Sequence, residues 1–365
     1  MKLLVSCIPA HEAPPVFTYG FVKGLVNNGV DVYVILADDI ENRNEWETLL
    51  DSDHIFWARV YSLKKNLFSA LFQYFVEYLQ LFLKYRLIRF DAYIRTFPVR
   101  KDEIFKHAVR SSQIVNICHD PIPHSGVSKK RSKSTKKRIE KSDKVIVLTE
   151  SFIPIVEKNF HKNSTDIIFM RHGLINYSNS EYNINRCFCL NKPIVFLFFG
   201  RYEPYKGIDI LLKAFDEISK ERSECELIVA GKGKLPDYKI KSKKVKVINR
   251  YIEDYEVDKI FREDNVVVVL PYKDATQSGI ITIAYEYLVP VIASDTGGLR
   301  EQLFDGEAGI MVPPNDVKAL KKAMISIDNQ FMYNKQVKAI QKYKKYLEWN
   351  NITYNFIKDL TKNEE

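Results

Sequence analysis

A continuous apolar strand and the loop that follows it run from Pro193 to Gly207 and read PIVFLFFGRYEPYKG. An apolar run of this kind is typical of a strand buried on both faces of a parallel sheet. Gly200 permits a tight turn, and Arg201 and Lys206 stand beside the free N–H groups that begin the next helix. We interpret the loop as a candidate diphosphate site; in the alternative, both cations solvate the loop or pair with Glu203.

Strands and helices alternate on both sides of this loop, with short polar turns between them. The strands are predicted at residues 2–7, 31–36, 91–96, 113–118, 144–148, 166–170, 193–199, 225–230, 244–249, 265–270 and 290–294. This alternation is typical of α/β proteins with parallel sheets. It predicts two Rossmann-like domains, with any ligand in a cleft at the carboxyl ends of the strands.

The segment from 176 to 192 is rich in Asn, Ser and Tyr and lacks periodicity, which indicates a linker. It separates an N-terminal domain over 1–175 from a second domain over 193–342. The tail carries apolar residues at spacings of three and four, namely Trp349, Ile352, Phe356 and Leu360. We therefore expect the helix over 343–365 to return to the first domain.

The composition of the 365 residues is that of a globular protein, with 46% hydrophobic and 28% charged residues. Five cysteines without CxxC spacing support neither a disulfide framework nor a zinc site, and they favour a reducing cytosol. The N-terminal apolar run is too short for an export signal, and the apolar segment 66–83 carries Gln73, Glu77 and Gln80. We predict no transmembrane span.

A second candidate loop follows the strand at 265–270 and reads PYKDATQSGI, from Pro271 to Ile280. Thr276 and Ser278 suit a helix N-cap, and Gly279 would let an anionic ligand approach the N–H groups of the first turn. Capping alone would explain both hydroxyl residues without a ligand. The donor-binding residues that we predict here are Asp274, Thr276, Gln277, Ser278, Gly279 and Ile280.

From Gly200 to about Pro314 the sequence resembles the donor-binding domain of the GT-B glycosyltransferases of family 4. The resemblance is carried by the Gly200-Arg201…Lys206-Gly207 loop, the Thr276-Gln277-Ser278-Gly279 turn, Thr296-Gly297-Gly298…Glu301, Gly309 and Val312-Pro313-Pro314. It implies a retaining transfer from a nucleotide-diphosphate sugar, with Arg201 and Lys206 neutralising the leaving diphosphate. With Arg201, Lys206 and the helix dipoles available, we expect that no metal or other cofactor is needed. Tyr251 and Ile252 are further donor-binding candidates.

The sequence departs from this family at one place. The paired glutamates of the family, which contact sugar and ribose hydroxyls, align with Ala275 and Ile283. Candidate substitutes are Asp274, Gln277 and Glu286, of which Glu286 could equally be a solvated helix residue. The identity of the donor is therefore left open.

In the first domain, the resemblance assigns His119, after the strand at 113–118, a contact to the donor sugar. His124 is a second candidate, and a histidine bonded to a loop carbonyl is the structural alternative. His11 and Glu12, after the first strand, correspond to the family's loop near donor and acceptor, although the glycine pair is absent. Asp51-Ser52-Asp53 has the form of a metal-binding motif but stands in no strand-end context, so we expect no metal there.

The segment from 129 to 144 is strongly positive, because it contains nine basic residues and only two acidic ones. We predict a patch for anionic lipid, formed by Lys129, Lys130, Arg131, Lys133, Lys136, Lys137 and Arg138. The segment 63–90 would either lie in a membrane interface as an amphipathic helix or be a core helix. No nucleic-acid motif accompanies the basic run, so we expect no nucleic-acid partner.

Together these features predict a cytoplasmic hexosyltransferase, peripheral on the inner face of the plasma membrane. Its partners would be a nucleotide sugar and a lipid-linked or oligosaccharide acceptor of cell-surface polysaccharide biosynthesis. Two alternatives stay open: an epimerase or hydrolase of nucleotide sugars with the same fold, or a non-catalytic protein that binds a membrane or nucleic acid.

Overall fold

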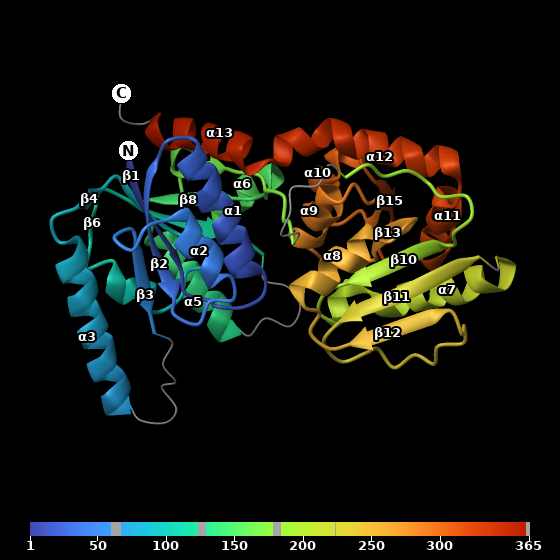
Figure 1. Cartoon of the computed structure of the whole chain (residues 1–365), viewed down its shortest axis with the longest axis horizontal. Coiled ribbons are helices and arrows are strands. Elements are labelled where there is room, and N and C mark those ends of the chain that lie inside the picture. Colours follow the sequence, from blue (N-terminus) through green and yellow to red (C-terminus); the bar gives the residue numbers. More distant parts are fainter. Residues whose placement is uncertain (60–66, 123–128, 178–183, 223, 363–365) are drawn as a thin grey trace. The chain divides into compact units, whose positions relative to one another are not determined.

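The computed structural model describes residues 1–59, 67–122, 129–177, 184–222 and 224–362, without the side chains of 67–70 and 129–132. The chain forms two compact units (Figure 1). Unit 1 contains Met1–Pro121, Val127–Gly173 and Glu348–Glu365, and unit 2 contains Ile122–Gly126 and Leu174–Leu347. The predicted cleft between two domains stays a prediction.

Unit 1 is built on a seven-stranded parallel sheet of order β3-β2-β1-β5-β7-β8-β9. Its strands are β1 (Lys2–Cys7), β2 (Asp31–Ala37), β3 (Ile55–Ala58), β5 (Ala92–Arg95), β7 (Ile114–Cys118), β8 (Lys144–Val147) and β9 (Ile167–Phe169). Two short parallel strands, β4 (Arg89–Phe90) and β6 (Arg110–Ser111), form a separate sheet. Since side chains alternate along a strand, Leu3 and Val5 join one core cluster while Leu4 joins another.

The helices of unit 1 cover both faces of this sheet. They are α1 (Ala13–Asn27), α2 (Arg43–Leu49), α3 (Leu67–Tyr85), α4 (Asp102–Phe105), α5 (Lys129–Glu140), α6 (Ile153–Phe160) and α13 (Trp349–Thr361), with 3-10 turns at Glu150–Phe152 and Ser164–Asp166. Helix α13 comes from the far end of the chain and packs on α1, where Ile352 and Phe356 enter the core. Its Trp349 ring lies 5.1 Å edge-to-face from Phe17.

Unit 2 is built on a six-stranded parallel sheet of order β12-β11-β10-β13-β14-β15. Its strands are β10 (Ile194–Phe199), β11 (Cys225–Gly231), β12 (Val245–Asn249), β13 (Val266–Leu270), β14 (Val291–Ser294) and β15 (Ile310–Val312). Its helices are α7 (Ile208–Glu221), α8 (Asp254–Arg262), α9 (Gly279–Glu286), α10 (Leu299–Gln302), α11 (Val317–Ile327) and α12 (Gln330–Lys344), with 3-10 turns at Pro204–Lys206, Phe304–Gly306 and Lys345–Leu347.

The predicted fold class is confirmed: both sheets are parallel and the strands alternate with helices. The sequence analysis missed the edge strands β3 and β15, which are four and three residues long and carry too little pattern to be recognised. The chain passes from unit 1 to unit 2 between Gly173 and Leu174, beside the predicted end of the first domain at 175.

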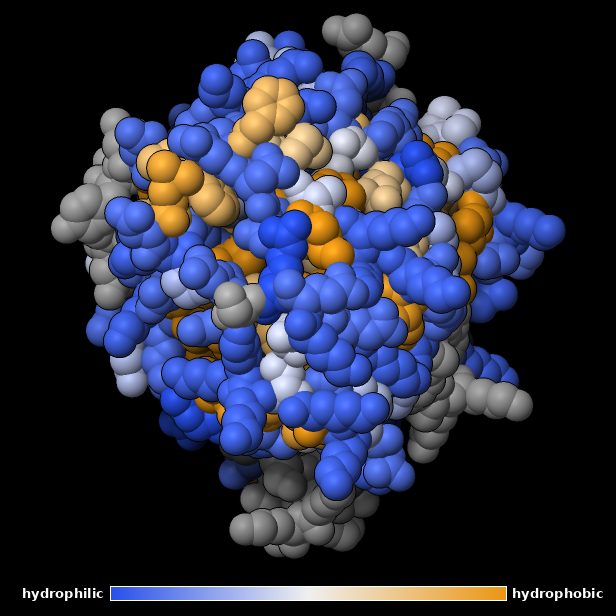
Figure 2. Space-filling model, turned by 90° about the vertical axis from the view of Figure 1, so that its right-hand side faces the viewer, coloured by the Kyte–Doolittle hydropathy of each residue, from blue (hydrophilic) through white to orange (hydrophobic). Residues whose placement is uncertain are grey.

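The surface of the protein is mostly polar where Figure 2 shows it, with hydrophobic residues in small groups among hydrophilic ones. None of the described helices combines the length and the apolar composition needed to cross a bilayer.

Candidate functional site

The candidate residues of unit 2 lie on loops at one edge of its sheet. Because all six strands are parallel, the loops that follow them meet at their carboxyl ends. Arg201 and Lys206 follow β10, Tyr251 and Ile252 follow β12, and residues 274–280 follow β13. The fold thus brings most of the predicted donor-binding residues to a single edge.

Lys206 lies across the glycine turn that ends β10. A Cβ built on Gly200 would stand 3.1 Å from Lys206 Nζ and 3.8 Å from Ile280 Cδ1. The same ammonium lies 5.4 Å from the centre of the Tyr272 ring. Lys206 Nζ therefore lies between the β10 turn and the Tyr272 ring, and Arg201 is exposed on the same loop.

Backbone contacts join the loop after β10 to the loop after β13. Gly207 has a φ of 68°, and a Cβ on it would stand 1.9 Å from the carbonyl oxygen of Pro271. The N–H of Lys273, two residues after Pro271, donates a hydrogen bond to the Tyr205 carbonyl at 2.7 Å. Only glycine permits both the left-handed backbone and this approach, so Gly207 holds the two loops together.

The N-terminus of α9 is capped and then held from outside the helix. Ser278 is the N-cap, and its Oγ accepts a hydrogen bond from the Ile280 N–H at 3.3 Å. The Gln302 side chain accepts from the Ser278 N–H at 2.7 Å and donates to the Ser278 carbonyl at 3.2 Å. The contacts of Ser278 and Gln302 fix this end of the helix. The other N–H groups of its first turn favour the binding of an anion.

A buried tyrosine connects this helix end to the lysine. The hydroxyl of Tyr272 lies 3.4 Å from Ser278 Oγ, and burial raises the pKa of Tyr272 to about 12. The phenol is therefore neutral at physiological pH. Lys206, Tyr272 and Ser278 form a continuous chain of contacts from the first candidate loop to the second.

The loop after β14 packs against the same turn. A Cβ on Gly297, which has a φ of 52°, would stand 1.6 Å from the Ala275 carbonyl oxygen, and the Gly298 N–H donates to the Thr276 carbonyl at 3.1 Å. Thr276 is buried in this contact. The Gly297-Gly298 pair thus shapes the turn that carries Gln277 and Ser278.

Gln277 has a buried amide oxygen, Oε1, for which the described part of the chain offers no hydrogen-bond partner. Buried acceptors in folded proteins are nearly always satisfied, so this oxygen is suited to a donor on a ligand. Asp274, three residues earlier, is exposed. Of the candidate substitutes for the missing glutamates, Gln277 has the side-chain environment that such a role needs.

Three predicted donor-binding residues have other surroundings. Glu286 lies at the opposite end of α9, and its Oε2 is 3.0 Å from Lys344 Nζ of α12. Ile252 is buried, whereas Tyr251 is 39% exposed and its carbonyl accepts from Arg250 at 3.0 Å. The structure does not bring Glu286 together with the loop residues.

In unit 1, His119 follows β7 and is held against an aromatic cluster. Its ring stacks on Phe97, with centroids 4.0 Å apart, and meets Phe17 edge-on at 5.2 Å. Nε2 lies 2.9 Å from the Thr96 carbonyl oxygen, so it carries the proton of the neutral ring and donates it there. Burial lowers the pKa of His119, which leaves Nδ1 as a hydrogen-bond acceptor.

A second histidine, His172, is buried beside the same Phe17 ring, with centroids 4.9 Å apart. Burial lowers the pKa of His172 to about 4, and nearby His119 disfavours its charged form further. Nδ1 lies 2.8 Å from the Gly173 carbonyl oxygen. The sequence analysis did not single out this residue, and no motif marks it.

The loop after β1 is strained. Glu12 has a φ of 67°, a left-handed conformation that is uncommon for residues with side chains. Glu41 holds the loop, because its Oε2 accepts from the Glu12 N–H at 2.9 Å and its Oε1 lies 3.2 Å from His11 Nδ1. Such strain is found at functional loops and agrees with a role for His11 and Glu12, which stays a prediction.

The remaining candidates are on α5 and in the segment before it. His124 lies outside the described residues, as do the side chains of Lys129, Lys130 and Arg131. Lys133, Lys136 and Lys137 are exposed on α5, and Lys136 lies 3.7 Å from Glu140. Arg138 is only partly exposed, and its carbonyl accepts from Asn116 at 3.0 Å.

The sequence analysis missed two residues that shape the unit 2 site, Tyr272 and Gln302. Both lie within or near the quoted motifs, but their roles depend on contacts to Lys206 and Ser278 that spacing does not reveal. Among the described residues, no group of three or more His, Cys, Asp or Glu side chains is placed to bind a metal ion.

Residues 193–329 match the family model described as glycosyl transferases group 1. A phosphatidyl-myo-inositol mannosyltransferase of Mycolicibacterium smegmatis is 27% identical over 164 residues, which are 43% of this chain and 42% of that protein. The chain thus spans less than half the length of this curated relative.

Two solved structures are similar along nearly the whole chain. HepE of Anabaena, in complex with UDP and glucose, has a TM-score of 0.72 at 14% identity, covering 99% of both chains. A sucrose-phosphate synthase of Thermosynechococcus elongatus has a TM-score of 0.71 at 16% identity, covering 98% of both. The chain therefore has the two-domain Rossmann-like GT-B fold, and its residues 193–329 match the glycosyl transferases group 1.

Proposed function

We propose that this protein is a hexosyltransferase that takes its sugar from a nucleotide-diphosphate donor bound at the carboxyl edge of the unit 2 sheet. The observation that carries the proposal is the position of Lys206 Nζ between Gly200 and the capped N-terminus of α9. A cation and free helix N–H groups stabilise the same anion from two sides.

In this mechanism the bond between the anomeric carbon and the diphosphate oxygen breaks, and the diphosphate leaves with the bonding electrons. Arg201 and Lys206 neutralise the charge that develops there, and the N–H groups at the start of α9 donate to it. The oxygen of an acceptor hydroxyl then forms the new glycosidic bond on the face from which the diphosphate departs, and the hydroxyl proton passes to the departing diphosphate oxygen, so the anomeric configuration is retained. Family resemblance supplies this outcome.

Two further residues have roles in the proposal. His119 contacts the donor sugar through Nδ1, which is available because Nε2 is engaged by the Thr96 carbonyl. Gln277 Oε1 accepts from a sugar or ribose hydroxyl in place of the family's missing glutamate; its unsatisfied, buried state supports this role. No metal or other cofactor is assigned.

For the acceptor, we propose a lipid-linked or oligosaccharide hydroxyl of cell-surface polysaccharide synthesis, used at the inner face of the plasma membrane. The similar protein of Mycolicibacterium smegmatis supports an acceptor of this kind, since it is a phosphatidyl-myo-inositol mannosyltransferase. The exposed lysines of α5 support attachment to anionic lipid.

A thermal-shift panel of UDP-, GDP- and dTDP-sugars tests the donor. A donor present at about 100 times its dissociation constant stabilises the folded state by about 2.7 kcal/mol. Arg201→Ala and Lys206→Ala should each abolish the shift and most of the turnover, whereas Lys318→Ala on α11 should leave both unchanged. Wild-type turnover in the first two variants would contradict the assigned roles.

Product analysis distinguishes the alternatives. Consumption of the nucleotide sugar without any acceptor would favour an epimerase or hydrolase, and NMR of the product's anomeric configuration tests retention. Absence of binding to every nucleotide and nucleotide sugar would favour a non-catalytic protein. The loss of both glutamates, at Ala275 and Ile283, is the observation that makes this last outcome worth testing.

A further inference from the structure

The outer face of helix α3 carries a row of exposed large apolar side chains. They recur at spacings of one, three and four and form what we call the α3 stripe: Leu71, Phe72, Phe75, Leu79, Phe82 and Leu83. Phe72 and Phe75 are 69% and 62% exposed, and Leu87, just beyond the helix, is 89% exposed. Contiguous apolar surface of this kind marks an interaction site on a folded protein.

The opposite face of α3 is firmly attached to unit 1. Glu77 is buried, where its Oε2 lies 2.6 Å from Lys101 Nζ and its Oε1 accepts from the Arg59 N–H at 2.6 Å. Leu81 and Tyr85 enter the core cluster of the sheet. Because these contacts fix the rotation of the helix about its axis, the α3 stripe faces outward at the margin of unit 1 (Figure 1).

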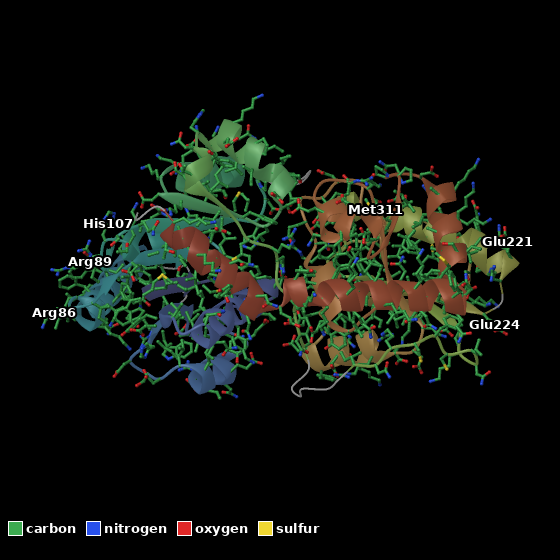
Figure 3. All side chains as sticks on the ribbon, turned by 90° about the horizontal axis from the view of Figure 1, so that it is seen from above. Arg86, Arg89, His107, Glu221, Glu224 and Met311 are labelled. Atoms are coloured by element: carbon green, nitrogen blue, oxygen red, sulfur yellow. The ribbon has the colours of Figure 1, made fainter. Side chains whose placement is uncertain are left out.

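Positive charge gathers at the C-terminal end of the stripe. Arg89 of β4 and Arg110 of β6 are directly opposite each other in the small parallel sheet. Like charges in this position repel, and the described residues provide no ion pair for either arginine. Figure 3 shows Arg86, Arg89 and His107 along the same edge of unit 1.

The arginine pair borders a pocket of about 720 Å³ whose lining includes Leu87, which follows the last residue of the α3 stripe, Leu83, by four positions. Its other cations are Lys106 and Lys141, and its one acidic residue is Asp143, whose carboxylate accepts from the Ile114 N–H at 2.6 Å. The pocket therefore has a surplus of positive charge next to an apolar surface.

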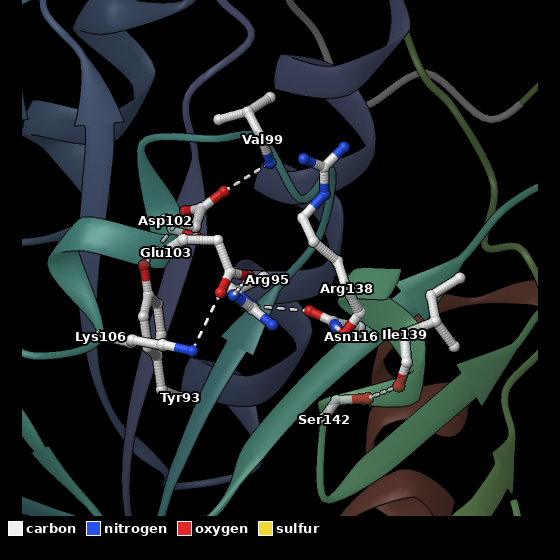
Figure 4. Close-up of polar contacts among 11 residues, drawn as sticks. Tyr93, Arg95, Val99, Asp102, Glu103, Lys106, Asn116, Arg138, Ile139 and Ser142 are labelled. Atoms are coloured by element: carbon white, nitrogen blue, oxygen red, sulfur yellow. Dashed lines mark hydrogen bonds and ion pairs between the residues drawn. The ribbon is translucent and has the colours of Figure 1, made fainter. Parts of the chain in front are cut away.

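Lys106, which lines this pocket, belongs to a polar network around the buried Arg95 (Figure 4). Glu103 lies 2.9 Å from Lys106 and 2.6 Å from Arg95, which is 1% exposed and donates to Asn116 at 2.6 Å. Glu103 neutralises part of this charge but does not reach Arg89, Arg110 or Lys141 in any described contact. The unpaired cations at the rim are thus left for an external anion.

We infer that the α3 stripe and the Arg89–Arg110 pair form one docking surface for an anionic phospholipid bilayer. The apolar side chains enter the acyl boundary, and the arginines bind lipid phosphates at the level of the headgroups. This arrangement of an apolar row with cations at its end is complementary to the layered chemistry of a membrane surface. The inference names the surface for the proposed membrane attachment, and it does not depend on sugar transfer.

Vesicle flotation of the full chain tests the inference. The protein should float with vesicles of phosphatidylcholine mixed with phosphatidylglycerol, and much less with phosphatidylcholine alone. A Phe72→Ser, Phe75→Ser double variant should lower binding by at least about tenfold, because two aromatic side chains no longer leave water. Arg89→Ala and Arg110→Ala should each weaken binding by about fivefold and reduce its sensitivity to salt.

Matched controls use residues of the same kind elsewhere. Phe331→Ser removes an aromatic side chain of α12 that is 75% exposed, and a Lys318→Ala, Lys322→Ala variant removes two exposed cations of α11. Both should bind vesicles like the wild type. Circular dichroism should show the same folded state in all variants, since every altered side chain is exposed.

Three results would overturn the inference. One is the absence of vesicle binding by the wild type, and another is wild-type binding by the Phe72→Ser, Phe75→Ser variant. The third is a dimer in light scattering that Phe72→Ser, Phe75→Ser dissolves, which would assign the stripe to a second copy. Nucleotide binding measured on the same samples separates these failures from failure of the proposed sugar transfer.

Discussion

The ammonium of Lys206 lies over the backbone of Gly200, 3.1 Å from the place where a Cβ on that glycine would stand. A turn with a φ of 118° and no side chain is what lets the lysine cross the end of β10 toward α9. The position of the cation in the candidate site thus depends on a residue that contributes no functional group.

Gly200→Ala should therefore weaken nucleotide-diphosphate binding. The new methyl group would displace Lys206 Nζ, and alanine is strained at this φ. We expect at least a tenfold rise in the dissociation constant for UDP or GDP, measured by calorimetry. Gly306→Ala, also at positive φ but next to Met311, is the control and should leave binding unchanged.

Gly207→Ala should destabilise unit 2. A Cβ would stand 1.9 Å from the Pro271 carbonyl oxygen, so the substitution adds a backbone clash to the cost of a left-handed conformation. We expect a loss of about 3 kcal/mol or more in the free energy of unfolding, against about 1 kcal/mol for Gly306→Ala. Urea denaturation measures the free energy of unfolding of both variants. Equal losses in Gly207→Ala and Gly306→Ala would show that the loops after β10 and β13 do not depend on the contact between Gly207 and Pro271.

Gln302 should act as a positioning residue for the N-terminus of α9. Gln302→Ala removes both hydrogen bonds to the Ser278 peptide, and we expect donor affinity to fall about tenfold with a smaller effect on stability. Gln302→Glu keeps an acceptor for the Ser278 N–H and should recover part of the affinity. If both variants bind the donor like the wild type, the hydrogen bonds between Gln302 and Ser278 have no part in donor binding.

His172 should make folding depend on acid pH. Its pKa is lowered to about 4 by burial, from an ordinary value of 6.5, so the unfolded chain binds a proton that the folded chain rejects. The free energy of unfolding should therefore rise with pH between about 4 and 6.5, by up to about 1.4 kcal/mol per pH unit from this group. Denaturation at a series of pH values measures the slope.

The control for His172 compares slopes rather than stabilities. His172→Gln should flatten the dependence between pH 4 and 6.5 even if it lowers stability overall. An unchanged slope in His172→Gln would mean that another group titrates.

Chelation should leave transfer unaffected. In the proposed mechanism Arg201, Lys206 and the α9 N–H groups supply the positive charge that a divalent ion would otherwise bring to the diphosphate. Turnover measured with and without EDTA checks this expectation. Loss of activity that added Mg²⁺ or Mn²⁺ restores would contradict it.

The motifs of unit 2 could be recognised from the sequence because each depends on residues close together in the chain. The glycine turn, the N-cap at Ser278 and the strand before each loop are local features with strong residue preferences. Glu286 shows the limit of such reasoning. Glu286 and Ser278 stand at opposite ends of the short helix α9. The helix therefore directs Glu286 to Lys344 and away from the loops.

The amino-acid sequence by itself determined the parallel α/β architecture and which loops carry cations, since periodicity and turn residues act over a few neighbours. Only the tertiary structure decided that Gln302 clamps Ser278, that His172 is buried beside Phe17, and that the outer face of α3 is exposed among the described residues. These features depend on residues distant in the chain. Which side of an apolar helix is buried is settled by its packing neighbours, because burial of either side would satisfy the same local pattern.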